Sequence, residues 1–296
     1  MHDPALPLRR SVLYVPAGNE RALLKSAALA CDAIIFDLED AVAPEEKASA
    51  RERLRAFLAG PRRPECEIAV RINALSGAWG TEDFLAARAV RPDAILLPKV
   101  EEPADIAQAE TALEETDAPR AIRLWAMIET PRGLMQAGAI AALGRAPDAR
   151  LSCLVAGTND LVKETGIDPG PERANLKPWL MQIVLAARAG SLGVLDGVSN
   201  DFRDLAAFAG ECAAARAMGF DGKTLIHPAQ IAAANSAFAP TAAEVAEAQA
   251  IVAAFARPEN QGRGVVSLGG RMVERLHLRM AEALIARAKR IEEKDG

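Results

Sequence analysis

Cysteine and aromatic residues are scarce in this 296-residue chain. The four cysteines, Cys31, Cys66, Cys153 and Cys212, lie far apart without a CxxC-type pair, which argues against a zinc site or a disulfide framework. We therefore expect reduced thiols in or near the core. Aromatic residues make up 4% of the chain and do not alternate with basic residues, so nothing indicates a base-stacking surface.

Long apolar runs and an excess of positive charge are also missing. No stretch approaches the roughly 20 apolar residues of a membrane span, and the first residues lack the apolar run of a signal peptide. The formal net charge of −5 disfavours a general nucleic-acid binder. These absences predict a soluble, cytoplasmic protein that binds neither membranes nor nucleic acid.

Short apolar runs, by contrast, recur along the chain. Most are continuous rather than alternating, as expected for parallel strands covered on both faces. We predict eight strands, at 11–17, 33–40, 67–73, 94–100, 122–130, 151–161, 194–199 and 222–228. Ala-, Leu- and Arg-rich segments with helical spacing lie between them, for example at 19–30, 44–59, 103–116, 132–143, 175–189 and 203–218. This alternation predicts an α/β fold, a (β/α)8 TIM barrel, with an open doubly wound sheet as the alternative.

The chain continues beyond the eighth predicted unit. We place the barrel at residues 1–240 and a C-terminal helical extension at 241–296. Residues 229–257 have helical spacing, 258–270 have the composition of a glycine-rich linker, and 271–292 form an amphipathic helix rich in Arg and Glu. A barrel does not need this extension, which could cap its own barrel or reach a neighbouring subunit.

Polar side chains gather where the predicted strands end. The charged ones are Glu39, Asp40, Arg71, Lys99, Glu129, Asp160, Asp196 and His227. A single charge at a strand end is often only solvated or paired. In a parallel barrel, however, all these ends meet on the face where active sites lie, so the charges should converge.

The side-chain chemistry predicts a metal site. Glu129 and Asp160 offer hard oxygen ligands from neighbouring strands, and two carboxylates with water suit Mg²⁺. Arg71 has a planar fork suited to a carboxylate or enolate oxygen. Glu39 and Asp40 could accept hydrogen bonds from metal-bound water. Lys99 would balance these acids or polarise a carbonyl, and we expect Asp37 to pair with Lys99.

Several motifs together resemble one known family. They are "RRSVLYVPAGN", "DAIIFDLEDAVAPEEK", "VRIN", "LPKVE", "MIETPRG", "GTNDL", "GFDGKTLIHPAQI" and "GGRMVERLHLRMAEALI". Nearly end to end, the chain resembles the citrate lyase β-subunit and malyl-CoA lyase family of the HpcH/HpaI aldolase group. The resemblance implies a (β/α)8 barrel, Mg²⁺, a CoA thioester substrate and assembly as a homotrimer or hexamer.

The resemblance also assigns roles to residues of the barrel. Glu129 and Asp160 would hold the metal, Arg71 would bind the keto-acid or enolate oxygen, and Glu39 and Asp40 would hold metal-bound water. The backbone around Gly157, Thr158, Asn159 and Asp160 would bind the substrate carboxylate. Arg10 and Lys25 match basic residues that contact CoA phosphates, whereas a third such position holds Asn19 in this chain, with Arg21 nearby.

The tail departs from the family pattern. The family places an Asp, active in acid–base chemistry at a neighbour's site, in a motif that reads "GGRMVE" here, so Glu274 takes its place. The extra methylene of Glu274 matters because small misplacements in such sites are costly.

The reaction implied by the resemblance is carbon–carbon cleavage of a malyl-, citramalyl- or citryl-CoA type 3-hydroxyacyl-CoA to a keto acid and an acyl-CoA. Its alternatives are a malyl-CoA thioesterase, a malate-synthase-like enzyme, a CoA-independent pyruvate aldolase, a subunit acting on an acyl-carrier protein, and a non-catalytic binding protein.

Overall fold

Eight parallel strands form a closed barrel in the computed structural model, which describes residues 7–61 and 64–296. Neighbours along the chain pair with one another, and β1 pairs with β8 to close the ring, so the predicted barrel is confirmed. The strands are β1 (Ser11–Pro16), β2 (Ala33–Asp37), β3 (Glu67–Arg71), β4 (Ala94–Leu97), β5 (Arg123–Ile128), β6 (Leu151–Ala156), β7 (Gly193–Asp196) and β8 (Gly222–Leu225).

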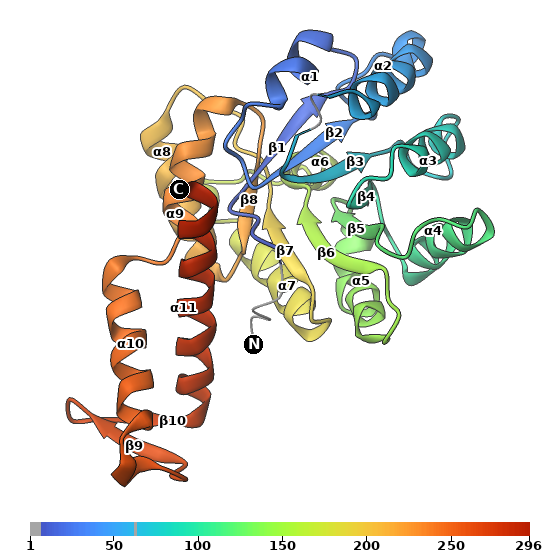
Figure 1. Cartoon of the computed structure of the whole chain (residues 1–296). Coiled ribbons are helices and arrows are strands. Elements are labelled where there is room, and N and C mark those ends of the chain that lie inside the picture. Colours follow the sequence, from blue (N-terminus) through green and yellow to red (C-terminus); the bar gives the residue numbers. More distant parts are fainter. Residues whose placement is uncertain (1–6, 62–63) are drawn as a thin grey trace. The chain divides into compact units, whose positions relative to one another are not determined.

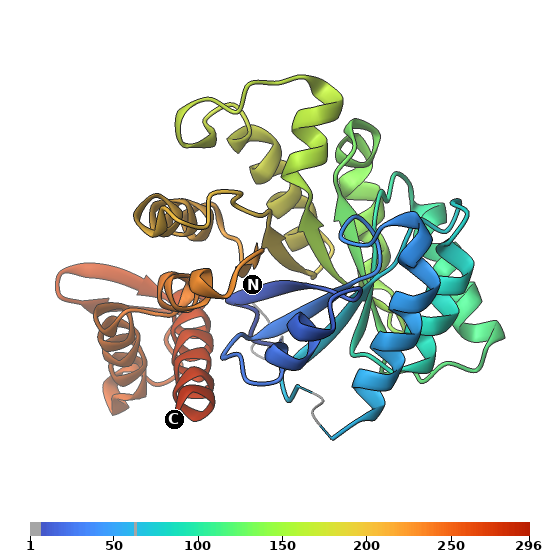
Figure 2. The same cartoon turned by 90° about the horizontal axis from the view of Figure 1, so that it is seen from above.

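Helices surround these strands (Figures 1 and 2). They are α1 (Glu20–Ser26), α2 (Lys47–Ala59), α3 (Gly80–Ala89), α4 (Pro103–Glu115), α5 (Pro131–Ala142), α6 (Thr158–Thr165), α7 (Lys177–Ala189), α8 (Leu205–Met218) and α9 (Ile231–Phe238). Pro103 and Pro131 occupy first helical positions, where a missing N–H costs nothing. Pro44 instead begins a 3₁₀ turn (Pro44–Glu46) that leads into α2.

The apolar residues of the strands divide between two packed layers. One layer fills the barrel interior and is built around Trp125, with Val12, Ile35, Leu96 and Val155 among its members. A larger layer lies between the strands and the helices. Because both faces of the strands are buried, their sequences read as continuous apolar runs.

The cysteines follow the same pattern of burial. Cys31, Cys153 and Cys212 are buried free thiols and Cys66 is half-buried, as the sequence predicts. Burial raises the pKa of Cys153 and of Cys212 to about 12, so both remain protonated at neutral pH.

The chain divides into two compact units, of which Arg9–Phe238 is the barrel and the other contains Ala239–Gly296. The second unit comprises α10 (Ala242–Ala256), a hairpin of β9 (Val265–Leu268) and β10 (Arg271–Glu274), and α11 (Arg275–Asp295). Helix α10 packs against α11.

Two expectations for this second unit are corrected. The predicted linker at 258–270 contains strand β9, and the helix predicted from 271 begins only at Arg275. Gly269 and Gly270 have φ of 58° and 78°, values that suit the tight turn of a two-stranded hairpin. Throughout the described ranges, no helix is both long enough and apolar enough to cross a membrane.

Candidate active site

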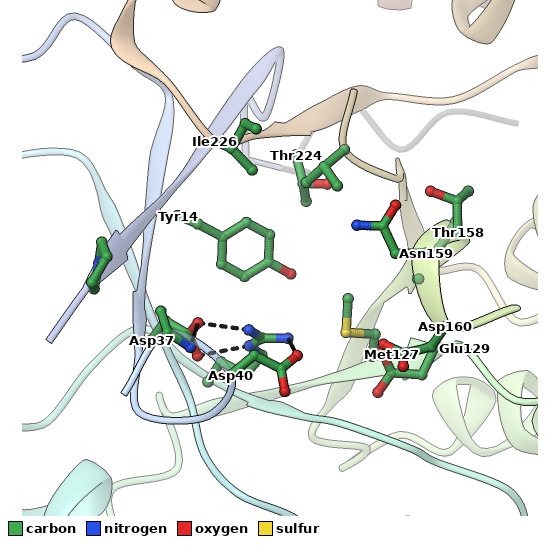
Figure 3. A pocket seen from close by; sticks show the side chains of 16 residues that line it. Tyr14, Asp37, Asp40, Met127, Glu129, Thr158, Asn159, Asp160, Thr224 and Ile226 are labelled. Atoms are coloured by element: carbon green, nitrogen blue, oxygen red, sulfur yellow. Dashed lines mark hydrogen bonds and ion pairs between the residues drawn. The ribbon is translucent and has the colours of Figure 1, made fainter. Parts of the chain in front are cut away.

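A cavity of about 360 Å³ opens at the carboxyl ends of the barrel strands (Figure 3). The structure brings several predicted site residues together in its wall: Asp40, Arg71, Glu129, Gly157, Thr158, Asn159 and Asp160. Tyr14, Asp37, Met127, Val198, Thr224 and Ile226 also line it, and the sequence interpretation gave none of these a role in the site. The cavity therefore combines opposite charges with apolar surface, as small-molecule sites do.

Arg71 is held at the centre of an acidic cluster. Its Nε and Nη2 donate to the two carboxylate oxygens of Asp37 at 2.8 and 2.6 Å. Its Nη1 lies 3.0 Å from Glu39 and 3.4 Å from Asp40. Burial alone would lower the pKa of Arg71, but the charge and hydrogen bonding of Asp37, together with electrostatic interactions with Tyr14 and Glu39, outweigh burial and raise that pKa, so the guanidinium stays charged.

The expected pairing of Asp37 with Lys99 is therefore wrong. Asp37 and Arg71 are direct neighbours in the β2–β3 register, and Lys99 instead approaches Glu39 at 3.6 Å. Burial raises the pKa of Glu39 to about 7, against the opposing charge of Arg71. Glu39 can therefore gain or lose a proton near neutral pH.

Glu129 follows β5 and is buried in the wall of the same cavity. Its Oε1 accepts a hydrogen bond from the backbone N–H of Lys99 at 2.7 Å. Lys99 adopts a φ of 49°, which is rare for a residue with a side chain and is typical of functional sites. Burial and the charge of Glu39 raise the pKa of Glu129 to about 8.

Asp160 lies in the first turn of α6 and lines the same cavity as Glu129. Within the described part of the chain its carboxylate makes no hydrogen bond or ion pair. Gly157 brings the backbone before α6 against Glu129, since a Cβ there would lie 2.2 Å from the Glu129 Cβ. The amides that begin α6 have no partner in the preceding turn and favour a negative ligand.

This pair of carboxylates fits a Mg²⁺ ion. Glu129 is buried with a raised pKa, and the carboxylate of Asp160 has no partner among the described residues. A cation held by both would relieve their repulsion. Within residues 7–61 and 64–296, no group of three or more His, Cys, Asp or Glu side chains is spaced to hold a metal. Mg²⁺ suits such a site because it keeps several waters and needs only one or two protein carboxylates.

A buried lysine that sequence reasoning missed supports the acidic loop after β2. Lys47 Nζ donates to the carbonyl oxygens of Leu38 and Glu39, both at 2.8 Å, and to Asn73 Oδ1 at 3.0 Å. Burial lowers the pKa of Lys47. Lys47 is the last residue of the "DAIIFDLEDAVAPEEK" motif. Its closeness in sequence to the acids of that motif could have indicated its role beside them.

Two of the predicted polar strand ends have structural partners. Asp196 is buried and bound by Lys223 at 2.7 Å and by Arg173 at 2.8 Å. His227 stacks on Phe202 with ring centroids 4.4 Å apart and accepts a hydrogen bond from the N–H of Ala229.

The predicted CoA contact Arg10 is contradicted. Its side chain is 1% exposed and pairs with Asp32 at 2.8 Å, and it precedes β1, at the end of the barrel opposite the cavity. A guanidinium buried in this way has no surface to offer a phosphate. Lys25 is exposed in the last turn of α1, and Glu274 caps the start of α11 in the C-terminal unit.

The sequence of the barrel decides the family. Residues 10–228 match the model of the HpcH/HpaI aldolase/citrate lyase family. The chain belongs to this family.

Full-length relatives agree with this assignment. The chain is 46% identical over 282 residues to a (3S)-malyl-CoA thioesterase of Cereibacter sphaeroides, with 95% of each chain covered. It is 35% identical to citrate lyase subunit beta of Haemophilus influenzae, with 96% of this chain and 98% of that one covered.

A solved structure matches as well. The CitE protein of Mycobacterium tuberculosis, in complex with magnesium, acetoacetate and coenzyme A, superposes with a TM-score of 0.77 at 30% identity. The match covers 97% of this chain and 100% of that one. The match therefore includes residues of both the barrel and the C-terminal unit of this chain.

Proposed function

We propose that this HpcH/HpaI family member is a Mg²⁺-dependent lyase that cleaves a malyl-CoA type 3-hydroxyacyl-CoA to a keto acid and an acyl-CoA. The observation that carries the proposal is the single cavity shared by Glu129, Asp160 and Arg71. The magnesium, acetoacetate and coenzyme A in the CitE structure support the same ligand classes here.

The residues of the cavity would have different roles in such a reaction. Glu129 and Asp160 would hold Mg²⁺, which when bound supplies a Lewis acid for negative charge on a substrate oxygen. Arg71 would donate hydrogen bonds to the oxygen that becomes negative as the C–C bond breaks. Glu39 and Asp40, beside Arg71, would hold an ordered water.

Proton movements complete the cleavage. Loss of the 3-hydroxyl proton turns that carbon into the keto-acid carbonyl, and the electron pair of the broken bond leaves as the thioester enolate. The enolate carbon then takes up one proton. Glu39 has a pKa of about 7, which suits a group that exchanges protons near neutral pH.

Hydrolysis of the thioester is the second candidate. The observation that favours it is the 46% identity to a (3S)-malyl-CoA thioesterase, which exceeds the 35% identity to a citrate lyase subunit. Hydrolysis would use the same cavity to polarise the thioester carbonyl for attack by water.

One screen distinguishes the two reactions. Malyl-, citramalyl- and citryl-CoA are each incubated with Mg²⁺ or EDTA, and keto acid and free thiol are followed separately. Cleavage releases keto acid without thiol, whereas hydrolysis releases thiol without keto acid. The Glu129→Gln variant should lose Mg²⁺-dependent turnover, and Glu164→Gln, which changes an exposed Glu on α6, should keep it. Full activity of Glu129→Gln would refute the metal assignment.

We further propose that the chain forms homotrimers or hexamers in which Glu274 acts at a neighbour's site. Glu274 is exposed at the start of α11 and carries the carboxylate that the family pattern places there. Glu129→Gln and Glu274→Gln subunits should each be inactive alone, and mixed oligomers should regain activity. Failure to regain activity after verified subunit exchange would refute this arrangement. Lys25 remains our proposed contact to the CoA phosphates.

A further inference from the structure

Tyr14 is the only tyrosine of the chain, and it lies in the wall of the active-site cavity. It belongs to β1, and its ring lies beneath the guanidinium of Arg71, 5.0 Å from ring centroid to Cζ. In Figure 3 its hydroxyl end points across the cavity toward the side that carries Met127 and Asn159. The ring therefore sits among the groups that define the site.

The hydroxyl of Tyr14 is shielded from solvent and has no hydrogen-bond partner in the described chain. A buried hydroxyl without a partner costs free energy, because water satisfies it in the unfolded chain. Phenylalanine would fill the same space without that cost. An unpaired buried polar group in a native protein therefore calls for a specific explanation, and a ligand that supplies the partner is one.

The surroundings define what such a partner must be. Burial raises the pKa of Tyr14, so the hydroxyl is a neutral donor across the physiological range. Both carboxylate oxygens of Asp37, the nearest acid on β2, are already engaged by Arg71. A ligand that Arg71 and a cation held by the carboxylate pair would attract can supply the acceptor, namely an oxygen of a small acid.

Access for that oxygen would come from movement of the Met127 side chain. Its thioether lines the same cavity, and an unbranched methionine side chain readily changes rotamer to admit a ligand atom. A ligand that fills the cavity would in any case pack on the Tyr14 ring.

We propose that the Tyr14 hydroxyl donates a hydrogen bond to an oxygen of the acid half of the substrate, and so contributes to selection of the keto acid. The inference rests on the proposed function, because it assumes that a keto acid or its 3-hydroxyacyl-CoA precursor binds this cavity. It predicts that the hydroxyl weakens the ligand-free protein and strengthens the complex. A residue with only a packing role would not show these opposite effects.

Two hydroxyl deletions in the same cavity test this directly. Tyr14→Phe removes a hydroxyl without a partner, so the melting temperature of the ligand-free protein should stay equal or rise. Thr224→Val is the matched control, because the Thr224 hydroxyl already donates to the carbonyl of Asp196 at 3.0 Å, and its loss should lower the melting temperature. With Mg²⁺, glyoxylate and pyruvate should bind Tyr14→Phe about 10- to 100-fold more weakly, the range for a hydrogen bond to a charged group.

The single tyrosine also permits a spectroscopic readout that does not depend on turnover. Tyrosine labelled with ¹³C at Cζ gives one resonance, which should shift when glyoxylate or pyruvate is added with Mg²⁺. The inference would be overturned if calorimetry shows keto-acid binding but the Tyr14 resonance does not shift, or if Tyr14→Phe binds the keto acids with unchanged affinity. Either result would leave the proposed function standing. Absence of any keto-acid binding to the unmodified protein would overturn both.

Discussion

The buried pair of Asp37 and Arg71 should dominate the stability of the cavity wall. Asp37 is 2% exposed and accepts two hydrogen bonds from Arg71, together with the amide of Glu39 at 2.9 Å. Breaking a buried pair costs about 3–5 kcal/mol, because the remaining charge loses its partner. Asp37→Asn keeps one acceptor oxygen, so we expect a loss of about 3 kcal/mol, toward the lower end. For a barrel of this size that corresponds to a fall in melting temperature of about 6–12 °C.

Thermal unfolding of matched variants checks this magnitude. Asp40 lies on the same loop and also approaches Arg71, but its side chain is 62% exposed and 3.4 Å away. Asp40→Asn should therefore cost less than about 1 kcal/mol. A double-mutant cycle of Asp37→Asn with Arg71→Gln should show a coupling of about 2 kcal/mol, since the two side chains share their hydrogen bonds. If the Asp37 and Asp40 variants lose the same small amount, the argument from burial is wrong.

Three further predictions concern pH, close packing and backbone strain. Because burial raises the pKa of Glu39 from 4.5 to about 7, the folded protein holds a proton that the unfolded chain has released. Stability should therefore fall as pH rises between these values. Glu39→Gln should flatten this dependence of the melting temperature on pH, and an unchanged slope would contradict the prediction. Gly157→Ala should displace Glu129 and weaken Mg²⁺ binding in calorimetry by about 10-fold or more. Gly138→Ala, with open space around its Cβ, should leave Mg²⁺ affinity unchanged, and equal losses in the two variants would refute the packing argument. Lys99→Gly keeps the left-handed backbone that binds Glu129, so its free energy of unfolding should exceed that of Lys99→Val by at least about 1 kcal/mol. Equal stability of the two variants would count against strain at this position.

The sequence was sufficient for the barrel because both layers that cover its strands are apolar, which leaves continuous apolar runs in regular alternation with helices. It was less informative where one composition serves two conformations. The glycine-rich run near Gly269 resembles a linker, yet a tight hairpin turn requires the same positive φ that a flexible segment tolerates.

The site, too, was predictable only in part. The positions of Glu129, Asp160 and Arg71 at the ends of predicted strands were enough to predict one shared cavity, because parallel strands run in the same direction. Pairing within the site needed the strand register, which places Asp37 opposite Arg71 and which a single sequence does not contain. Arg10 was assigned from its motif, although its position before β1 already put it at the other end of the barrel.

The balance of charge around the cavity has a consequence for the order in which ligands arrive. The carboxylates outnumber the cations: among the described residues, the acids Asp37, Glu39, Asp40, Glu129 and Asp160 lie near three cations, Arg71, Lys99 and Lys47. An acid that approaches this surface alone meets net repulsion, and the repulsion grows as pH rises and the two glutamates with raised pKa values ionise. A divalent cation cancels much of that charge. Initial-rate kinetics should therefore show compulsory order, with the cation first and the acid second.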